Sequence, residues 1–306
     1  MTNKLTNSKQ YPLVSIITPA YNRAGLIEET ILSVLDQSYP NIEYIVIDDG
    51  STDNTLEIIK KYEDKLILIT QDNIGETKTV NRGFRLSNGA LIAVVNSDDP
   101  LLPGAVSTVV TYMENNPDAL VAYPDWNEID INSNVIKTMH LPEYDIFSML
   151  EEFNVSLGLG TFIRSRALES YGLRDPSFKY SGDIEYWFRL ASYGKLLHIP
   201  EVLATHRVHP EAASSSQKSA EMGNEAVRAI RKLFYRQDLP KNVLKLQSIA
   251  MSNAHLSAKN YCGSDILAKV RHLVSFIFFD PLYSIPKTLE ILFFWFVKFF
   301  KNKIRH

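Results

Sequence analysis

The sequence predicts an α/β protein with a mainly parallel central sheet flanked by helices. Three apolar runs rich in β-branched residues, at 13–18, 42–47 and 90–95, end abruptly in polar or acidic residues. Segments in which apolar residues recur at helical spacing separate these runs. Strands that alternate with helices imply a parallel sheet with helices on both faces.

The elements follow one another regularly along the chain. After the strand at 13–18, a helical crossover is marked by Leu26, Ile27, Ile31, Leu32, Val34 and Leu35. The strand at 42–47 runs into Asp48-Asp-Gly-Ser-Thr-Asp53, whose last three residues are N-cap types before a helix at 56–62. A third strand is expected at 65–70, a helix at 77–87, and a hairpin or irregular excursion at 125–137.

The fourth apolar strand ends in Asn96-Ser-Asp-Asp99. Open α/β sheets bind ligands beyond the carboxyl ends of their strands, so Asp98 and Asp99 are expected at the functional edge. Their oxygens are hard ligands suited to Mg²⁺ or Mn²⁺ against a diphosphate. The alternative is an Asx turn that caps the next helix, at 103–116, with Pro103 in its first turn. The recurrence of polar ends on three strands favours a ligand site.

The chain resembles family 2 glycosyltransferases in several motifs that occur in the family's order over about residues 12–212. The motifs are Ser15-Ile-Ile-Thr-Pro-Ala-Tyr-Asn-Arg23, Val46-Ile-Asp-Asp-Gly-Ser-Thr-Asp53, Asn73-Ile-Gly75, Asn81-Arg-Gly83, Asn96-Ser-Asp-Asp99, Asp183-Ile-Glu-Tyr-Trp-Phe-Arg-Leu190 and Arg207-Val-His209. The resemblance implies a GT-A fold, which is Rossmann-like, and an inverting enzyme of the hexosyltransferase type that uses nucleotide-activated sugars.

The resemblance implies that the end of the first strand and the Asp-Asp-Gly loop hold the nucleotide. The Tyr21 ring can stack on the base, and Asp48 or Asp49 can accept from the uracil N3–H, without a ranking of the two. The alternative for Tyr21 and Asn22 is an ordinary strand-to-helix turn. The residues expected around the donor are Pro19, Tyr21, Asn22, Asp48, Asp49, Asn73, Lys78, Asn96, Ser97, Asp98 and Arg207.

The metal motif departs from the family's commonest form, which has a carboxylate where Asn96 stands. We expect Asp98 to be the principal ligand of Mn²⁺ or Mg²⁺, Asp99 a second ligand or one bound through water, and Asn96 a weak ligand or ribose contact. The resemblance supports a metal or phosphate role for His209. His206 is expected to be structural. Arg207 can pair with a diphosphate oxygen or with the neighbourhood of Asp183, and Lys78 is a weaker phosphate candidate.

Asp183 begins a helical segment that extends to Leu190. A carboxylate at this position is favourable for the helix dipole whatever its function. The resemblance implies more, namely that Asp183 is the general base that takes the acceptor hydroxyl proton. The family often has Glu immediately before this Asp, whereas this chain has Gly182. Glu185 faces another side of the helix and is expected to be structural or acceptor-binding.

Length and composition suit one large domain with an appendage, and we place the boundary between a catalytic domain at 1–212 and a helical region at 213–306. The single cysteine, Cys262, excludes an intramolecular disulfide and suits a reducing cytoplasm. Residues 1–10 are polar, so we expect no signal peptide and a cytoplasmic enzyme.

The charge is distributed unevenly. Residues 213–306 carry 15 Lys+Arg against 6 Asp+Glu, a balance of +9, so the whole-chain −3 leaves −12 for residues 1–212. Helices are expected at 217–237, 240–260, 264–279 and 285–303. No nucleic-acid-binding motif accompanies this basic region, and we expect no nucleic-acid partner.

The last expected helix is strongly apolar with one basic stripe. Its uninterrupted apolar run, 291–297, is only 7 residues long, which is too short to span a membrane. We expect it to lie at the inner, anionic face of the membrane. The alternative is a helix packed on the catalytic domain or on a partner in an oligomer.

Together these features predict transfer of a sugar from a nucleotide-sugar, with UDP favoured, to a glycan or lipid-linked saccharide. A nucleotidyltransferase is one alternative, but it needs a Gly-rich loop with basic residues after the first strand, and residues 18–25 offer only Arg23. A catalytically silent nucleotide-sugar binder or membrane scaffold is another. The presence of both Asp98 and Asp183 argues against it.

Overall fold

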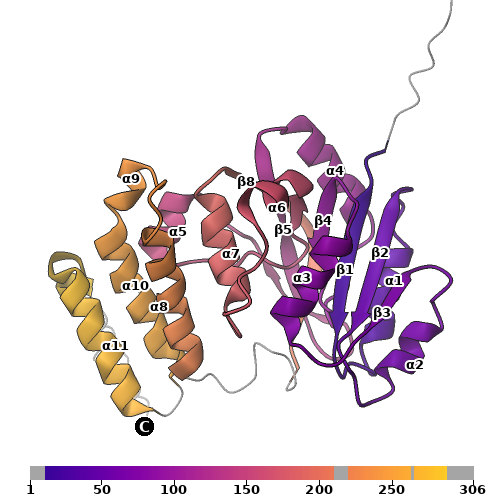
Figure 1. Cartoon of the computed structure of the whole chain (residues 1–306), viewed down its shortest axis with the longest axis horizontal. Coiled ribbons are helices and arrows are strands. Elements are labelled where there is room, and N and C mark those ends of the chain that lie inside the picture. Colours follow the sequence, from indigo (N-terminus) through magenta and orange to yellow (C-terminus); the bar gives the residue numbers. More distant parts are fainter. Residues whose placement is uncertain (1–10, 210–219, 263–264, 288–306) are drawn as a thin grey trace, which may run out of the picture. The chain divides into compact units, whose positions relative to one another are not determined.

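The computed structural model describes residues 11–209, 220–262 and 265–287, which belong to two compact units. The first unit comprises residues up to 144, 156–179 and 193–215. The second comprises 145–155, 180–192 and the residues from 216 onward. The predicted α/β fold with a central, mainly parallel sheet is confirmed in the first unit, and the C-terminal helices belong to the second (Figure 1).

Four parallel strands form one side of the sheet, in the spatial order β3-β2-β1-β4. They are β1 (Val14–Ala20), β2 (Ile42–Asp48), β3 (Ile67–Thr70) and β4 (Leu91–Val94). Both faces of β1 and most of β2 are buried, which explains why these strands are apolar throughout rather than alternating. Because β1 pairs with both β2 and β4, the ends of these three strands lie at one edge.

The other side of the sheet is mixed. The short strand β7 (Phe162–Arg164) runs antiparallel between β4 and β5 (Ala119–Ile129). The hairpin expected at 125–137 is present, because β5 pairs antiparallel with β6 (Val135–Met139). Strand β8 (Lys195–Arg207) pairs parallel with β5.

Helices pack around the sheet within the first unit. They are α1 (Ile27–Leu35), α2 (Thr55–Lys60), α3 (Glu76–Leu86), α4 (Ala105–Asn115) and α6 (Ser165–Tyr171). The expected start of α4 at Pro103 is wrong by two residues. Gly104 adopts φ +79°, a left-handed conformation that interrupts the helix, so α4 begins only at Ala105.

The second unit is helical. It contains α5 (Ile146–Glu152), α7 (Gly182–Ala191), α8 (Ala220–Phe234), α9 (Lys241–Leu244), α10 (Gln247–Tyr261) and α11 (Ile266–Phe279). Helix α10 packs against α8, α11 and α5, and α7 packs against α8. Two segments from within residues 1–212 thus join the C-terminal helices. The single helix expected at 240–260 is instead two, α9 and α10.

None of the helices in the described part of the chain is long and apolar enough to cross a membrane. Most of the helix expected at 285–303 lies outside the described residues.

Candidate functional site

The loops after β1 and β2 are joined by hydrogen bonds at the edge of the sheet. Asn22 has φ +52°, a conformation that Asn tolerates better than most residues. Its Oδ1 accepts from the Thr52 backbone N–H at 2.8 Å, and its own N–H donates to Ser51 Oγ at 3.0 Å. Asn22 therefore fixes one loop on the other. The neighbouring Tyr21 is 44% exposed, so its ring is available for stacking on a base.

The two carboxylates of the Asp-Asp-Gly loop are both buried but differ in their contacts. Asp49 Oδ1 accepts from Gln71 Nε2 at 2.6 Å and from the Ile74 N–H at 3.0 Å, and Oδ2 accepts from the Gly75 N–H at 3.0 Å. Asp49 thereby holds the loop that carries Asn73. Asp48 accepts from the Ser51 N–H through Oδ2, whereas its Oδ1 is buried without a partner among the described residues.

The carboxylate of Asp98, which follows β4, is held by the guanidinium of Arg23 and the imidazole of His209. Its Oδ2 lies 3.1 Å from Arg23 Nε and 3.1 Å from His209 Nε2. The Arg23 guanidinium also donates to the carbonyls of Tyr21 and Asn22, so it joins the first loop to the acidic turn. The side chain of Asp98 is 13% exposed. Oδ1 makes no hydrogen bond to any residue that the structure describes, and it remains available to a ligand.

Asp99 is directed into the protein. Its Oδ1 accepts from the Arg207 N–H at 2.8 Å and its Oδ2 from Asn96 Nδ2 at 2.9 Å. Burial, followed by the negative charge of Asp98, raises the pKa of the Asp99 carboxyl to about 6. Both oxygens are thus used to shape the turn. This arrangement disfavours Asp99 as a direct metal ligand and leaves the water-bound alternative.

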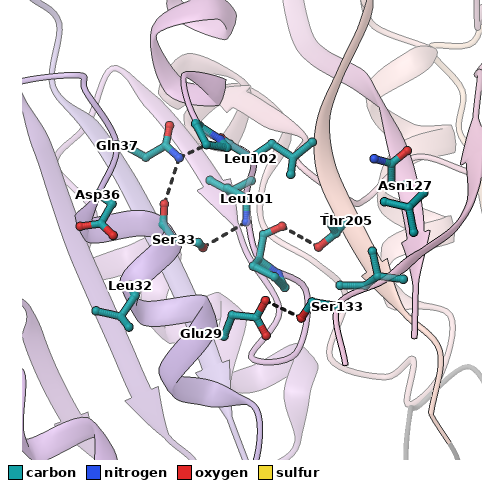
Figure 2. Close-up of a pocket in the computed structure, with 14 residues that line it drawn as sticks. Glu29, Leu32, Ser33, Asp36, Gln37, Leu101, Leu102, Asn127, Ser133 and Thr205 are labelled. Atoms are coloured by element: carbon teal, nitrogen blue, oxygen red, sulfur yellow. Dashed lines mark hydrogen bonds between the residues drawn. The ribbon is translucent and has the colours of Figure 1, made fainter. Parts of the chain in front are cut away.

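The segment at 100–103 that follows the acidic turn is braced from several sides (Figure 2). Gln37 Nε2 donates to the Leu102 carbonyl at 3.0 Å, and the Leu101 N–H donates to Ser33 Oγ at 3.1 Å. On the other side, Thr205 Oγ1 donates to the Pro100 carbonyl at 2.7 Å. These contacts fix the position of the acidic turn. The residues that make them line a cavity of about 360 Å³ between α1 and the β5–β6 hairpin.

Arg207 does not face the edge of the sheet. Its side chain is fully buried, and its guanidinium donates to Glu29 Oε2 at 2.5 Å and to the carbonyls of Asp98 and Asp130 at 3.1 and 2.9 Å. These contacts disfavour the phosphate contact expected from the sequence, because the donors are already committed. His206 packs edge-on against Trp126, as expected for a structural residue.

The other residues expected around the donor differ in exposure. Asn73 and Lys78 are exposed, Pro19 and Asn96 are partly buried, and Ser97 is 6% exposed. Sequence reasoning missed the roles of Arg23 and Gln71, which hold Asp98 and Asp49. Only the position of Arg23 at the end of the first motif could have indicated its role.

Comparisons with known proteins show the family to which the chain belongs. The family described as "Glycosyl transferase family 2" matches residues 15–168, half of the chain. The chain belongs to this family. The Escherichia coli enzyme "UDP-Glc:alpha-D-GlcNAc-diphosphoundecaprenol beta-1,3-glucosyltransferase WfaP" is 30% identical to this glycosyltransferase over 67% of the chain and 81% of that enzyme.

Two solved structures share the fold of this glycosyltransferase. S. aureus TarS in complex with UDP-GlcNAc has a TM-score of 0.69 at 18% identity, over 87% of this chain and 80% of TarS. A mannosyltransferase from Pyrobaculum calidifontis in complex with GDP-Man and Mn²⁺ has a TM-score of 0.62 at 17% identity, over 93% of this chain and 81% of that one. At these identities the likeness shows the GT-A fold alone.

Two residues of the glycosyltransferase, Asp98 and His209, fit a divalent metal, but they do not form a complete set of protein ligands. No group of three or more His, Cys, Asp or Glu side chains able to hold a metal occurs within the described ranges. Asp98 and His209 are in contact, however, and Asp98 Oδ1 accepts no hydrogen bond from the part of the chain that the structure describes. Because Mg²⁺ is commonly bound by one or two carboxylates together with substrate phosphates, a complete protein cage is not required.

Asp183 lies in the helical unit of the glycosyltransferase, at the second residue of α7. Its Oδ1 accepts from the Ile184 N–H at 2.8 Å, and burial together with the Asp183 charge raises the pKa of Tyr261. Glu185 is 4% exposed and pairs with Arg189 Nε at 3.0 Å and Lys232 Nζ at 2.8 Å. Glu185 thus links α7 to α8, in agreement with the structural role expected for it.

Proposed function

We propose that this glycosyltransferase transfers a sugar, with inversion, from a UDP-sugar to a hydroxyl of a glycan or lipid-linked saccharide. The observation that carries the proposal is the Asp98 carboxylate. It is fixed by Arg23 and His209 through Oδ2 and keeps Oδ1 free at the end of β4, beside the strands that carry the Tyr21 and Asp48-Asp49 loops. This is the edge at which open α/β sheets bind nucleotides.

In this proposal the uracil stacks on the exposed ring of Tyr21. Asp48 or Asp49 accepts from the base N3–H. Asp48 Oδ1 is the carboxylate oxygen of this pair that has no partner among the described residues, whereas Asp49 accepts from the loop at 73–75. The buried, unpartnered oxygen therefore favours Asp48 for the base, with Asp49 positioning the loop around it.

Asp98 and His209 would hold a divalent metal, Mn²⁺ or Mg²⁺, together with the donor diphosphate. When bound, the metal supplies positive charge that stabilises the negative charge on the departing nucleoside diphosphate. Arg23 sets the orientation of Asp98 and, next to it, contributes a fixed positive charge. Asn96 orients Asp99, which in turn shapes the acidic turn.

We propose Asp183 as the general base, on the ground of the family resemblance at residues 183–190. Its carboxylate would take the proton of the acceptor hydroxyl as that oxygen attacks the anomeric carbon. The bond from the anomeric carbon to the diphosphate oxygen breaks, and its electron pair leaves with UDP. Such base catalysis contributes about 10²–10⁴-fold to the rate.

The acceptor and the location are proposed from chemistry and from one relative. The name of the E. coli relative includes a diphosphoundecaprenol-linked acceptor, which supports a lipid-linked saccharide here. The basic, apolar residues at 285–306 would hold the enzyme peripherally at the inner face of an anionic membrane. An oligomer is compatible with this arrangement.

A screen of UDP- and GDP-sugars with Mn²⁺, Mg²⁺ or EDTA tests the proposal. We expect a UDP-sugar to raise the melting temperature only with metal, and slow release of UDP to be abolished by Asp98→Asn. Stabilisation without turnover under any acceptor condition would support the silent binder. Release of pyrophosphate from a nucleoside triphosphate would support the nucleotidyltransferase.

A further inference from the structure

The helical unit contains a cavity of about 370 Å³ that none of the proposed chemistry uses. Helices α8, α10 and α11 form it, and the described residues that line it include no carboxylate. Its ionisable lining consists of three arginines and two histidines: Arg228, Arg231, Arg271, His255 and His272. A hollow with this lining has a positive potential and suits an anion.

The two histidines are buried and contact each other. His255 Nδ1 lies 2.9 Å from His272 Nδ1, and the residues are 8% and 1% exposed. The Nε2 atom of each ring is buried with no hydrogen-bond partner among the described residues. A buried polar nitrogen without a partner is costly, so an unpartnered Nε2 on a residue that lines the cavity points to a missing ligand.

The contact between the Nδ1 atoms determines what the free nitrogens can do. One Nδ1 must donate and the other accept, so in the neutral pair one Nε2 is a donor and the other an acceptor. If the pair gains one proton, both Nδ1 atoms keep their hydrogen bond and both Nε2 atoms become N–H donors. A single proton thus gives the pair a positive charge. Because the rings meet end to end, with their centroids 5.2 Å apart, the Nε2 atoms point away from each other and one anion can accept from only one of them.

The arginines supply the remaining charge. Arg228 and Arg231 are three residues apart on α8 and share one face of the helix. Arg228 pairs with Glu225 at 3.3 Å, and Arg271 donates to Asn224 Oδ1 at 3.3 Å. Burial, and then the charges of His272, Arg231 and Arg271, lower the pKa of His255 to about 4. The positive charges of both Arg231 and Arg271 therefore act on the histidine pair.

We propose that this cavity binds a phosphoryl anion, either free in solution or as the phosphate of a lipid headgroup. Forked guanidinium donors bind phosphate oxygens in pairs, and the histidine pair adds one further donor and a positive charge when it takes up a proton. The anion relieves the repulsion among the arginines and accepts a hydrogen bond from one of the two Nε2 atoms. This inference does not depend on the identity of the sugar donor.

Binding of inorganic pyrophosphate to the full chain, measured by calorimetry, tests the site. We expect Arg231→Gln with Arg271→Gln to weaken binding at least about tenfold, since each charged hydrogen bond contributes more than the free energy of a tenfold change. Lys245→Gln, which removes an exposed charge of the same unit outside the cavity, should bind as the natural protein does. Arg231→Lys with Arg271→Lys keeps the charge without the fork and should fall between them.

Vesicles distinguish the two sources of phosphate. If the site takes lipid headgroups, the double Gln variant should float less than Lys245→Gln with phosphatidylglycerol vesicles, and neither should float with phosphatidylcholine vesicles. Equal flotation of the two variants together with the expected pyrophosphate result assigns the site to a soluble phosphoryl compound.

Sulfate, which keeps its charge between pH 5.5 and 8, tests the histidine pair. We expect sulfate to bind more tightly at pH 5.5 than at pH 8, because binding is coupled to uptake of a proton that His255 otherwise gains only near pH 4. Among the described residues, the charged groups facing the pair are Arg228 and Arg231 from α8 and Arg271 from α11. Equal binding of pyrophosphate by the double Gln variant and Lys245→Gln, or binding to neither pyrophosphate nor anionic vesicles, would overturn the proposal.

Discussion

Arg23 and Asp98, which are 75 residues apart in the sequence, form an ion pair with Nε 3.1 Å from Oδ2. The pair joins the loop after β1 to the end of β4. His209 reaches the same oxygen from beyond the end of β8. A single carboxylate oxygen thus links three distant segments, and the other oxygen of Asp98 is left for a ligand.

We predict that Asp98→Asn abolishes the metal-dependent stabilisation by UDP. A ligand that binds only the folded protein adds about 2.7 kcal/mol to the free energy of unfolding at a concentration 100 times its Kd. The variant loses the charge that holds the metal, and thermal shifts with UDP in Mn²⁺ and in EDTA measure the loss. Asn96→Ala should weaken the shift less. Asp72→Asn, an exposed acid of the same unit, serves as control. Equal shifts in Mn²⁺ and EDTA for the natural protein would refute the metal assignment.

Asp183→Asn should leave UDP binding nearly unchanged and lower sugar transfer at least about 10²-fold, because a proton acceptor is removed. Steady-state transfer and UDP calorimetry on the same preparations measure the two effects. Glu221→Gln, an exposed acid of the helical unit, is the matched control. Glu185→Gln is unsuitable, since it breaks buried pairs with Arg189 and Lys232. A variant that keeps more than a tenth of the activity would place the base elsewhere.

Arg207→Lys should destabilise the protein by about 3 kcal/mol while leaving UDP affinity within a factor of two or so. Lysine cannot reach Glu29 and two backbone carbonyls at once, as the buried guanidinium does. Urea denaturation and UDP titration separate the two quantities. Arg85→Lys, at an exposed position on α3, should change neither. If stability is kept and UDP affinity is lost, the phosphate role expected from the sequence is restored.

The stability of the protein should fall as the pH drops below about 6.5. Burial lowers the pKa of folded His255 to about 4, so the unfolded chain takes up this proton first on acidification. The contribution of His255 to the free energy of unfolding is complete above the pKa of this residue in the unfolded chain, about 6.5, and is lost as the pH falls toward 4. At pH 5 the loss amounts to about 2 kcal/mol. Urea denaturation in phosphate-free buffer at pH 7.5 and 5 should show a smaller loss for His255→Gln. Identical losses for both proteins would contradict this pKa.

Deletion of residues 285–306 should release the protein from anionic liposomes in a flotation assay while donor hydrolysis stays measurable. The segment combines Trp295 and other apolar residues with Lys298, Lys301, Lys303 and Arg305, each worth about 1 kcal/mol near an anionic surface. Replacing the four basic residues with Gln tests the charge alone. Flotation that persists after the deletion, or a truncated protein that does not fold, would favour a helix packed on protein.

The sequence by itself determined the fold class, the family and the acidic residues that follow the strands at the edge of the sheet. Strands β1, β2 and β4 can be recognised locally, because strands buried on both faces require continuous apolar runs. The polar or acidic residues that end these runs are local features too. The family motifs predicted the donor loops and the role of Asp98 from local sequence as well, since each motif occupies one short stretch of chain.

Only the tertiary structure decided which of these side chains are free to bind. It joined Arg23 to Asp98, turned both oxygens of Asp99 inward, committed Arg207 to Glu29, and brought together His255 and His272 from two helices. Asn96 and Asp99 are only three residues apart, but the other pairs lie 17 to 178 residues apart in the chain. Local periodicity specifies which face of an element is buried, whereas the partner of a buried polar group depends on how distant elements pack.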